Sequence, residues 1–240
     1  MFFEFVYPLV RYFTPLNVFQ YLSFRGAYAA MTTLFLCYVF GPRVILALSR
    51  LKVGQIVREE LPMHMSKEGT PTMGGVFIII SIVIAMFLWT DFSNLMVWIT
   101  MGALAAFGLL GFLDDYLKIR KKTSGGLSPK KKLAGQFIIS LTVMLVLYNI
   151  GSDDITYLYI PFFKDPVHNL GVLWIPFGIL LIMGTSNAVN FGDGLDGLLA
   201  GLLILVFITM SILAYLSGHA EFSAYLGIPF IPGAGELMIF

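Results

Sequence analysis

Six long stretches without Asp, Glu, Lys or Arg constrain this chain more than any other feature. A helix needs about 17–25 predominantly apolar residues to span the hydrocarbon layer of a bilayer. The six stretches reach that length at residues 26–42, 74–90, 95–113, 133–151, 170–190 and 198–216. We therefore expect an all-α fold, a polytopic membrane helix bundle with six complete transmembrane helices and the start of a seventh at residues 237–240.

The composition supports one membrane domain. Of the 240 residues, 58% are hydrophobic and 12% are charged, whereas charged residues make up about a quarter of a soluble domain. This composition excludes intrinsic disorder, a disulfide scaffold and a secreted soluble enzyme. The single Cys37 cannot form an internal disulfide. We expect a single integral membrane domain over residues 1–240, apparently truncated at its C-terminus, with an aromatic N-terminal interfacial segment over residues 1–20 whose residues 3–15 form a helix.

Basic residues gather in two connections between the predicted spans. One group follows the first span, at positions 43–67, and the other lies between the third and fourth spans, at positions 118–132. Basic residues in short loops are retained on the cytoplasmic side of a membrane. Both connections should therefore face the cytoplasm, and the N-terminus should lie outside. Arg25, at the border of the first span, is expected to extend its guanidinium to the outer interface.

Two pairs of acidic residues lie at the ends of predicted spans. Asp114 and Asp115 follow the third span, and Asp193 and Asp196 precede the sixth. The predicted topology places all four at the same cytoplasmic interface. Carboxylates beside hydrocarbon are costly unless they are hydrated, paired or bound to a cation. Each pair also has a purely structural explanation, as the end of a span in water or as a helix cap.

The second acidic pair belongs to a longer polar series. Asn187, Asn190, Asp193 and Asp196 recur every three residues, which places them on roughly one face if the segment is helical. Glycines within the series make a continuous helix doubtful. Hard oxygen ligands of this kind suit Mg²⁺, which proteins usually bind through one or two carboxylates together with substrate phosphates. The pattern therefore favours phosphoryl transfer, in which positioning and charge neutralisation supply most of the catalysis.

A polar loop also precedes the second span, at residues 66–75. Its glycines let the backbone approach a ligand, and Lys67 and the hydroxyl of Thr72 are suited to contact phosphate or sugar. A flexible turn that enters a helix is the alternative interpretation of this loop.

Taken together, these motifs resemble the polyprenyl-phosphate hexose-1-phosphate transferases, and within that family the branch that uses a MurNAc-pentapeptide donor. The resemblance covers nearly the whole chain. Four motifs carry it, at residues 67–75, 112–116, 187–190 and 193–197. The resemblance implies a ten-helix, multi-pass enzyme of the bacterial inner membrane with its active site on the cytoplasmic face. Such an enzyme transfers phospho-MurNAc-pentapeptide from UDP-MurNAc-pentapeptide to undecaprenyl phosphate, with Mg²⁺ as cofactor, and gives lipid I and UMP.

The resemblance also assigns roles to residues. Asp114 and Asp115 correspond to the essential acidic pair, which would act in catalysis and as metal ligands. The remaining positions correspond to the substrate-binding cleft: Lys67, Thr72, Asn187, Asn190, Asp193, Gly194, Leu195, Asp196 and Lys132. Family members continue past residue 240 with a further Asp expected to bind Mg²⁺ and a histidine-rich loop. We therefore expect the 240-residue chain alone to be inactive.

Several alternatives stay open at this stage. An Asp could act as a base for direct attack by the lipid phosphate, or it could attack first and form a phospho-enzyme. A sister enzyme that transfers N-acetylglucosamine-1-phosphate would carry the same acidic motifs. A transporter is a more distant alternative, because transporter sites usually lie near the midplane of the bilayer, whereas the acidic pairs are expected at one interface. The chain could also serve only as a binding or assembly partner. The resemblance is compatible with a homodimer, and we expect no nucleic-acid partner.

Overall fold

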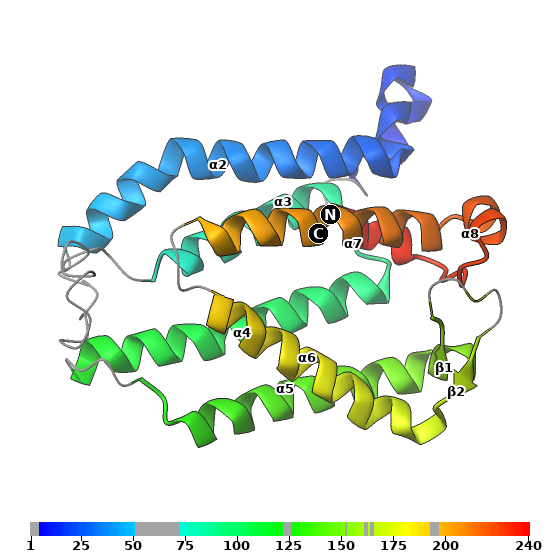
Figure 1. Cartoon of the computed structure of the whole chain (residues 1–240). Helices are drawn as coiled ribbons and strands as arrows, with labels where there is room; N and C mark the ends of the chain where they lie inside the picture. Colours follow the sequence, from blue (N-terminus) through cyan, green and yellow to red (C-terminus); the bar gives the residue numbers. More distant parts are fainter. Residues whose placement is uncertain are drawn as a thin grey trace. The chain divides into compact units, whose positions relative to one another are not determined.

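The computed structural model describes residues 5–50, 73–121, 126–151, 153–160, 163, 166–192 and 197–240. These residues are largely helical (Figure 1), which confirms the predicted all-α membrane fold. Five of their helices are long and apolar enough to cross a membrane. They are α2 (Leu22–Arg50), α4 (Leu95–Lys121), α5 (Pro129–Ile150), α6 (Trp174–Gly192), which continues the short 3-10 helix η5 (Gly171–Leu173), and α7 (Leu198–Ser217). The sixth predicted span is α3 (Gly74–Trp89), an apolar helix of only 16 residues.

The chain divides into two compact units. The first consists of Met1–Thr90 and Met101–Gly135, and the second of Asp91–Thr100 and Gln136–Phe240. Helices α4 and α5 each contribute residues to both units. The single membrane domain expected from the sequence stays a prediction.

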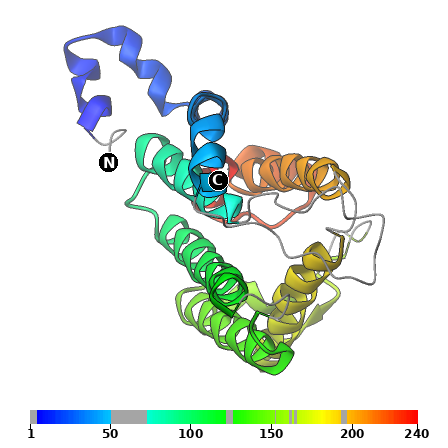
Figure 2. The same ribbon diagram turned by 90° about the vertical axis from the view of Figure 1, so that its left-hand side faces the viewer.

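In the first unit, α2 packs against α3, and the two helices lie side by side in Figures 1 and 2. Their contact is anchored at Trp89, the last residue of α3. Arg25 Nη1 donates a hydrogen bond of 3.1 Å to the Trp89 carbonyl oxygen. The indole Nε1 of Trp89 donates to Thr32 Oγ1 at 2.9 Å. The Trp89 ring also lies 5.3 Å from the ring of Tyr28.

This contact corrects the expectation that Arg25 extends to the outer interface. The residue is only 3% exposed, and its guanidinium binds the last turn of α3. The carbonyl groups at a helix C-terminus lack intrahelical partners and carry the negative end of the helix dipole. The buried cation of Arg25 is therefore stabilised by the end of α3. The spacing of residues along the sequence does not reveal this partner, because it lies on another helix.

Replacing Arg25 with Met should destabilise the protein by about 2 kcal/mol, because a hydrogen bond from a charged donor is lost and a helix-end carbonyl loses its partner. Thermal unfolding of the detergent-purified protein measures this change. The matched control is Arg11→Met, since Arg11 is exposed on the N-terminal segment. Equal unfolding temperatures for the two variants would contradict the proposed anchoring role of Arg25.

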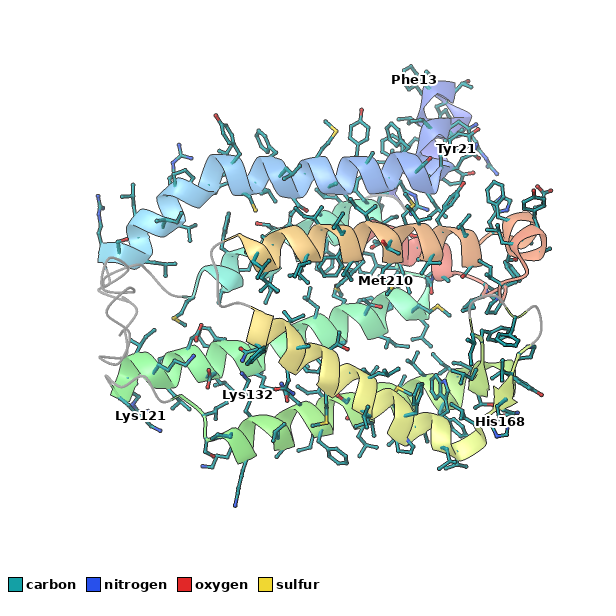
Figure 3. All side chains as sticks on the ribbon, in the orientation of Figure 1. Phe13, Tyr21, Lys121, Lys132, His168 and Met210 are labelled. Atoms are coloured by element: carbon teal, nitrogen blue, oxygen red, sulfur yellow. The ribbon has the colours of Figure 1, made fainter. Side chains whose placement is uncertain are left out.

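The N-terminal segment is not one α-helix over residues 3–15. Two short 3-10 helices, η1 (Tyr7–Arg11) and η2 (Thr14–Gln20), follow each other, and each carries a proline in its first turn. Phe13, between the two helices, is extended with φ −143° and ψ 93°, so a continuous helix is interrupted there, and proline at the first turn of η2 lacks the N–H that would continue the first helix. Aromatic side chains remain exposed here, including Phe13 and Tyr21 (Figure 3). The interfacial role of the segment therefore stays a prediction.

In the second unit, the C-terminal residues pack against α7. Helix α8 (Ala220–Leu226) follows α7, and the 3-10 helix η6 (Ala234–Ile239) then lies along it. Asn94 Nδ2 donates to the Gly233 carbonyl oxygen at 2.7 Å, and the Asp91 amide donates to Glu236 Oε2 at 3.1 Å. The segment expected to begin a seventh span is thus part of this 3-10 helix.

A small β-hairpin between α5 and α6 was not predicted. Strand β1 (Tyr157–Leu158) pairs antiparallel with β2 (His168–Asn169). Thr156 Oγ1 donates to Asn169 Oδ1 at 2.8 Å and ties the base of the hairpin together. The strands have only two residues each, too few for an alternating pattern to be recognised in the sequence.

Candidate active site

The acidic pair lies within a helix. Helix α4 does not end with the predicted span at residue 113 but continues to Lys121. The 19 uncharged residues before Asp114 cover about 28 Å at 1.5 Å per residue, close to the thickness of the hydrocarbon layer. Basic residues in the last turn of α4 are favourable at the negative end of the helix dipole. Asp114 and Asp115 therefore lie just beyond the apolar part of α4, in a helical turn rather than in a loop.

Lys118 binds both carboxylates of the pair. Its Nζ lies 2.7 Å from Asp114 Oδ2 and 3.0 Å from Asp115 Oδ1. These contacts follow from the helix, because residues three and four positions apart lie on the same face. One ammonium group thus compensates the charge of two neighbouring carboxylates.

Asp114 also organises the connection between α4 and α5. Its Oδ1 accepts a hydrogen bond of 2.7 Å from the Leu127 backbone amide. The positive charge of Lys132, in the first turn of α5, also acts on this carboxylate. Figure 3 labels Lys132 and Lys121, the last residue of α4. The Asp114 side chain is 15% exposed and that of Asp115 is 38% exposed. Asp114 is thus the anchored carboxylate, and Asp115 is the more accessible one.

Gly126 lies directly against Asp114. A Cβ atom added at Gly126 would lie 2.7 Å from the Asp114 carbonyl oxygen and 2.8 Å from its Cγ. Real Cβ atoms essentially never approach other atoms so closely. The absence of a side chain at position 126 is therefore what lets Gly126 and Leu127 lie against the Asp114 carboxylate.

The two carboxylates fit an incomplete Mg²⁺ site. Across the described residues, no group of three or more His, Cys, Asp or Glu side chains could hold a metal ion. Mg²⁺ is usually bound by one or two carboxylates, with waters and substrate phosphates as the other ligands. Asp114 and Asp115 can supply such a pair of carboxylates if Lys118 withdraws from them.

The asparagines of the second motif lie in the last turns of α6. This helix continues through Asn187 and Asn190 to Gly192. Helix α7 begins after Gly197, whose φ of 79° is a left-handed conformation that favours glycine. Asn187 is half-buried and hydrogen-bonded, whereas Asn190 is exposed. Both belong to the second compact unit, whereas Asp114, Asp115 and Lys132 belong to the first.

The described residues cover part of the predicted site. Asp114 and Asp115 are adjacent on α4 and share Lys118 as a partner, and the positive charge of Lys132 acts on Asp114. The other predicted positions lie outside the described residues: Lys67, Thr72, Asp193, Gly194, Leu195 and Asp196.

Sequence reasoning missed three further residues. They are Lys118, Gly126 and Gln136, whose side-chain oxygen accepts a hydrogen bond from Asn187. Lys118 could have been found from its helical spacing to the acidic pair. Gln136 could have been found as an amide within an otherwise apolar span. Nothing in the sequence marks Gly126, because its importance depends on the close approach of the loop to α4.

Comparisons with known proteins match the whole chain. Residues 97–234 match the family model described as glycosyl transferase family 4, and residues 67–79 match phospho-N-acetylmuramoyl-pentapeptide-transferase signature 1. A phospho-N-acetylmuramoyl-pentapeptide-transferase from Desulfosudis oleivorans is 42% identical over 241 residues. Relatives with the same name from Citrifermentans bemidjiense and Thermodesulfovibrio yellowstonii are each 43% identical. Each alignment covers 100% of this chain and 67% of the relative.

The matched ranges contain every predicted site residue. The signature includes Lys67 and Thr72, and the family model extends over both acidic pairs and both asparagines.

Proposed function

The chain belongs to the phospho-N-acetylmuramoyl-pentapeptide-transferases of glycosyl transferase family 4, and on this basis we propose the reaction that it catalyses. It transfers phospho-MurNAc-pentapeptide from UDP-MurNAc-pentapeptide to undecaprenyl phosphate and gives lipid I and UMP in peptidoglycan synthesis. The observation that carries this proposal is an identity of 42% or 43% over the whole chain to relatives with this name. The relatives' names favour neither the sister sugar transfer nor transport.

The proposed site uses carboxylates, amides and cations to bind the two substrates. Asp115, the more accessible carboxylate, meets the reacting phosphates, and Asp114 holds the adjacent loop in place. Cationic side chains are suited to the phosphate oxygens; they are Lys132 and Lys67. The residues that border the uridine and the diphosphate are Thr72, Asn190, Asp193, Gly194, Leu195 and Asp196.

Mg²⁺ is the proposed cofactor. Asp114 and Asp115 would hold it, together with substrate phosphates. Bound there, it would neutralise the charge of the diphosphate. The two lysines contribute to the same neutralisation from this chain. The geometry supports such a site, because the two carboxylates already share one cationic partner, Lys118.

Two routes lead to the same products. In the direct route, Asp115 accepts a proton from the lipid phosphate, an oxygen of that phosphate bonds to the β-phosphorus, and the bond to UMP breaks. In the covalent route, a carboxylate oxygen attacks the β-phosphorus first and releases UMP; an oxygen of the lipid phosphate then attacks the same phosphorus and the carboxylate leaves. We propose the direct route. Trapping a radiolabelled acyl-phosphate on the protein would contradict it as the sole route.

The experiment is a transfer assay with undecaprenyl phosphate and Mg²⁺. It compares UDP-MurNAc-pentapeptide with UDP-N-acetylglucosamine as donor, and it compares the 240-residue chain with a chain extended to the length of its relatives. We expect lipid I from the extended chain with the first donor alone, and no product after Mg²⁺ is chelated. The 240-residue chain should be inactive, because it spans 67% of the relatives' length.

Transfer from UDP-N-acetylglucosamine alone would instead establish the sister reaction. No product from either donor would contradict the proposed function.

The same assay tests the proposed location. The site should face the cytoplasm from the inner membrane. Basic residues in the last turn of α4 and the first turn of α5 flank the acidic pair, and basic residues near span ends are retained on the cytoplasmic side. Sealed inverted vesicles should consume donor added outside them, whereas right-side-out vesicles should not. Consumption by right-side-out vesicles alone would reverse the topology.

A further inference from the structure

A pair of hydrogen-bonded amides, one buried and one half-buried, joins α5 to α6. Gln136, in the second turn of α5, is 1% exposed. Asn187 Nδ2 donates to Gln136 Oε1 at 2.9 Å, and Gln136 Nε2 lies 3.5 Å from Asn187 Oδ1. Gln136 Nε2 also donates to Ser186 Oγ at 3.1 Å. These three residues form what we call the α5–α6 clamp, and all of them belong to the second compact unit.

The clamp uses the donor capacity of Asn187. A neutral amide group has two N–H donors. In Asn187 one donates to Gln136 and the other to the Met183 carbonyl oxygen at 2.8 Å. A buried amide in a membrane protein is costly unless its groups are paired. The side chain of Asn187 is therefore held within the protein and presents no N–H group to a ligand.

Asn190 is in the opposite situation. It lies three residues further along α6, close to the same face of the helix as Asn187, and it is exposed. No hydrogen bond of its side chain is found among the described residues. The clamp fixes the rotation of α6 about its axis one turn before Asn190, and so determines the direction in which the Asn190 amide points.

We propose that Gln136 and Asn187 are positioning residues, which orient the last turn of α6 and with it Asn190, the amide already assigned to the substrate-binding cleft. This inference rests on the proposed function and changes the role that the sequence assigns to Asn187. Asn187 acts through the backbone of α6, and a residue on another helix, Gln136, is equally important.

The experiment uses the chain extended to the length of its relatives. Gln136→Met keeps the length of the side chain and removes the amide, and Asn187→Leu does the same for its partner. The double variant and Asn190→Leu complete the series. The matched control is Thr142→Val, because Thr142 lies on α5, is exposed, and donates its hydroxyl hydrogen bond to the Ile138 carbonyl oxygen of its own helix. The readouts are kcat, the KM for each substrate and the unfolding temperature.

The two single variants and the double variant should raise the KM for the UDP donor by the same factor of about ten, the effect of one neutral hydrogen bond. Equal effects are expected because either substitution removes the same clamp. The KM for undecaprenyl phosphate and kcat should stay within about twofold of the wild-type values. Asn190→Leu should have the larger effect, and Thr142→Val should have none.

Three results would overturn the inference. An unchanged donor KM in Gln136→Met would remove the positioning role while the proposed function stands. A loss in Asn187→Leu that far exceeds the loss in Gln136→Met would show that Asn187 contacts the substrate directly. A parallel fall of kcat, both affinities and the unfolding temperature would show that the clamp only stabilises the fold. Absence of transfer by the wild-type extended protein would instead contradict the proposed function, and this inference with it.

Discussion

Replacing Asp115 with Asn should lower kcat for lipid I formation by about a thousandfold while the protein stays folded. A positioned general base contributes about 10²–10⁴-fold to a rate, and an amide cannot accept the proton or compensate a cation. The side chain is 38% exposed, and among the described residues its ion pair is with Lys118 on the surface of α4, so the substitution leaves no buried group unpaired there. The transfer assay on the extended chain measures kcat, and thermal unfolding measures stability.

The control for this substitution is Glu221→Gln. Glu221 is an exposed acid in the first turn of α8, and its replacement makes the same carboxylate-to-amide change far from α4 in the sequence. Its kcat should match the wild-type value. An Asp115→Asn variant that keeps more than a tenth of the wild-type kcat would contradict a catalytic role for Asp115.

Replacing Gly126 with Ala should lower kcat by about a hundredfold. The added Cβ would lie 2.7 Å from the Asp114 carbonyl oxygen, so the connection has to move away from α4. Movement breaks the 2.7 Å hydrogen bond from the Leu127 amide to Asp114 Oδ1. A misplacement of about 1 Å in an active site can cost 10²-fold in rate. Asp114 itself is unchanged, so this variant tests the geometry of the carboxylate separately from its chemistry.

Gly111→Ala provides the matched control for Gly126→Ala. Gly111 lies on α4 one turn before the acidic pair, and a Cβ added there meets nothing within 4 Å. The same Gly-to-Ala change should leave kcat unaltered and stabilise the helix by up to about 1 kcal/mol. Comparable rates for the two variants would show that the closure of the loop over Asp114 does not matter for the reaction.

The membrane fold was predictable because it depends on local composition. The apolar stretches at residues 95–113, 133–151 and 198–216 correspond to α4, α5 and α7. The continuation of α4 past residue 113 was not foreseen, although its cause lies in the sequence. Lys118 is spaced to pair with both carboxylates, and such pairs stabilise a helix where charged residues would otherwise suggest its end.

The functional interpretation rested on motifs and could be made from the sequence alone. The acidic pair, the asparagines and the loop that contains Lys67 and Thr72 identified the family, and the comparisons confirm that identification. Their roles could not be derived in the same way. Asn187 and Asn190 look equivalent in the sequence, yet one is hydrogen-bonded to Gln136 and the other is exposed.

The spans, the clustering of charges at their ends and the family follow from the amino-acid sequence, because each depends on residue types and short spacings. Which polar groups bind one another follows from the packing of the folded chain. Arg25 binds the end of α3, Asp114 binds the Leu127 amide, and Gln136 binds Asn187. These partners come from other helices or from a loop, and buried polar groups must find partners wherever packing brings them. No pattern along one segment can specify that choice.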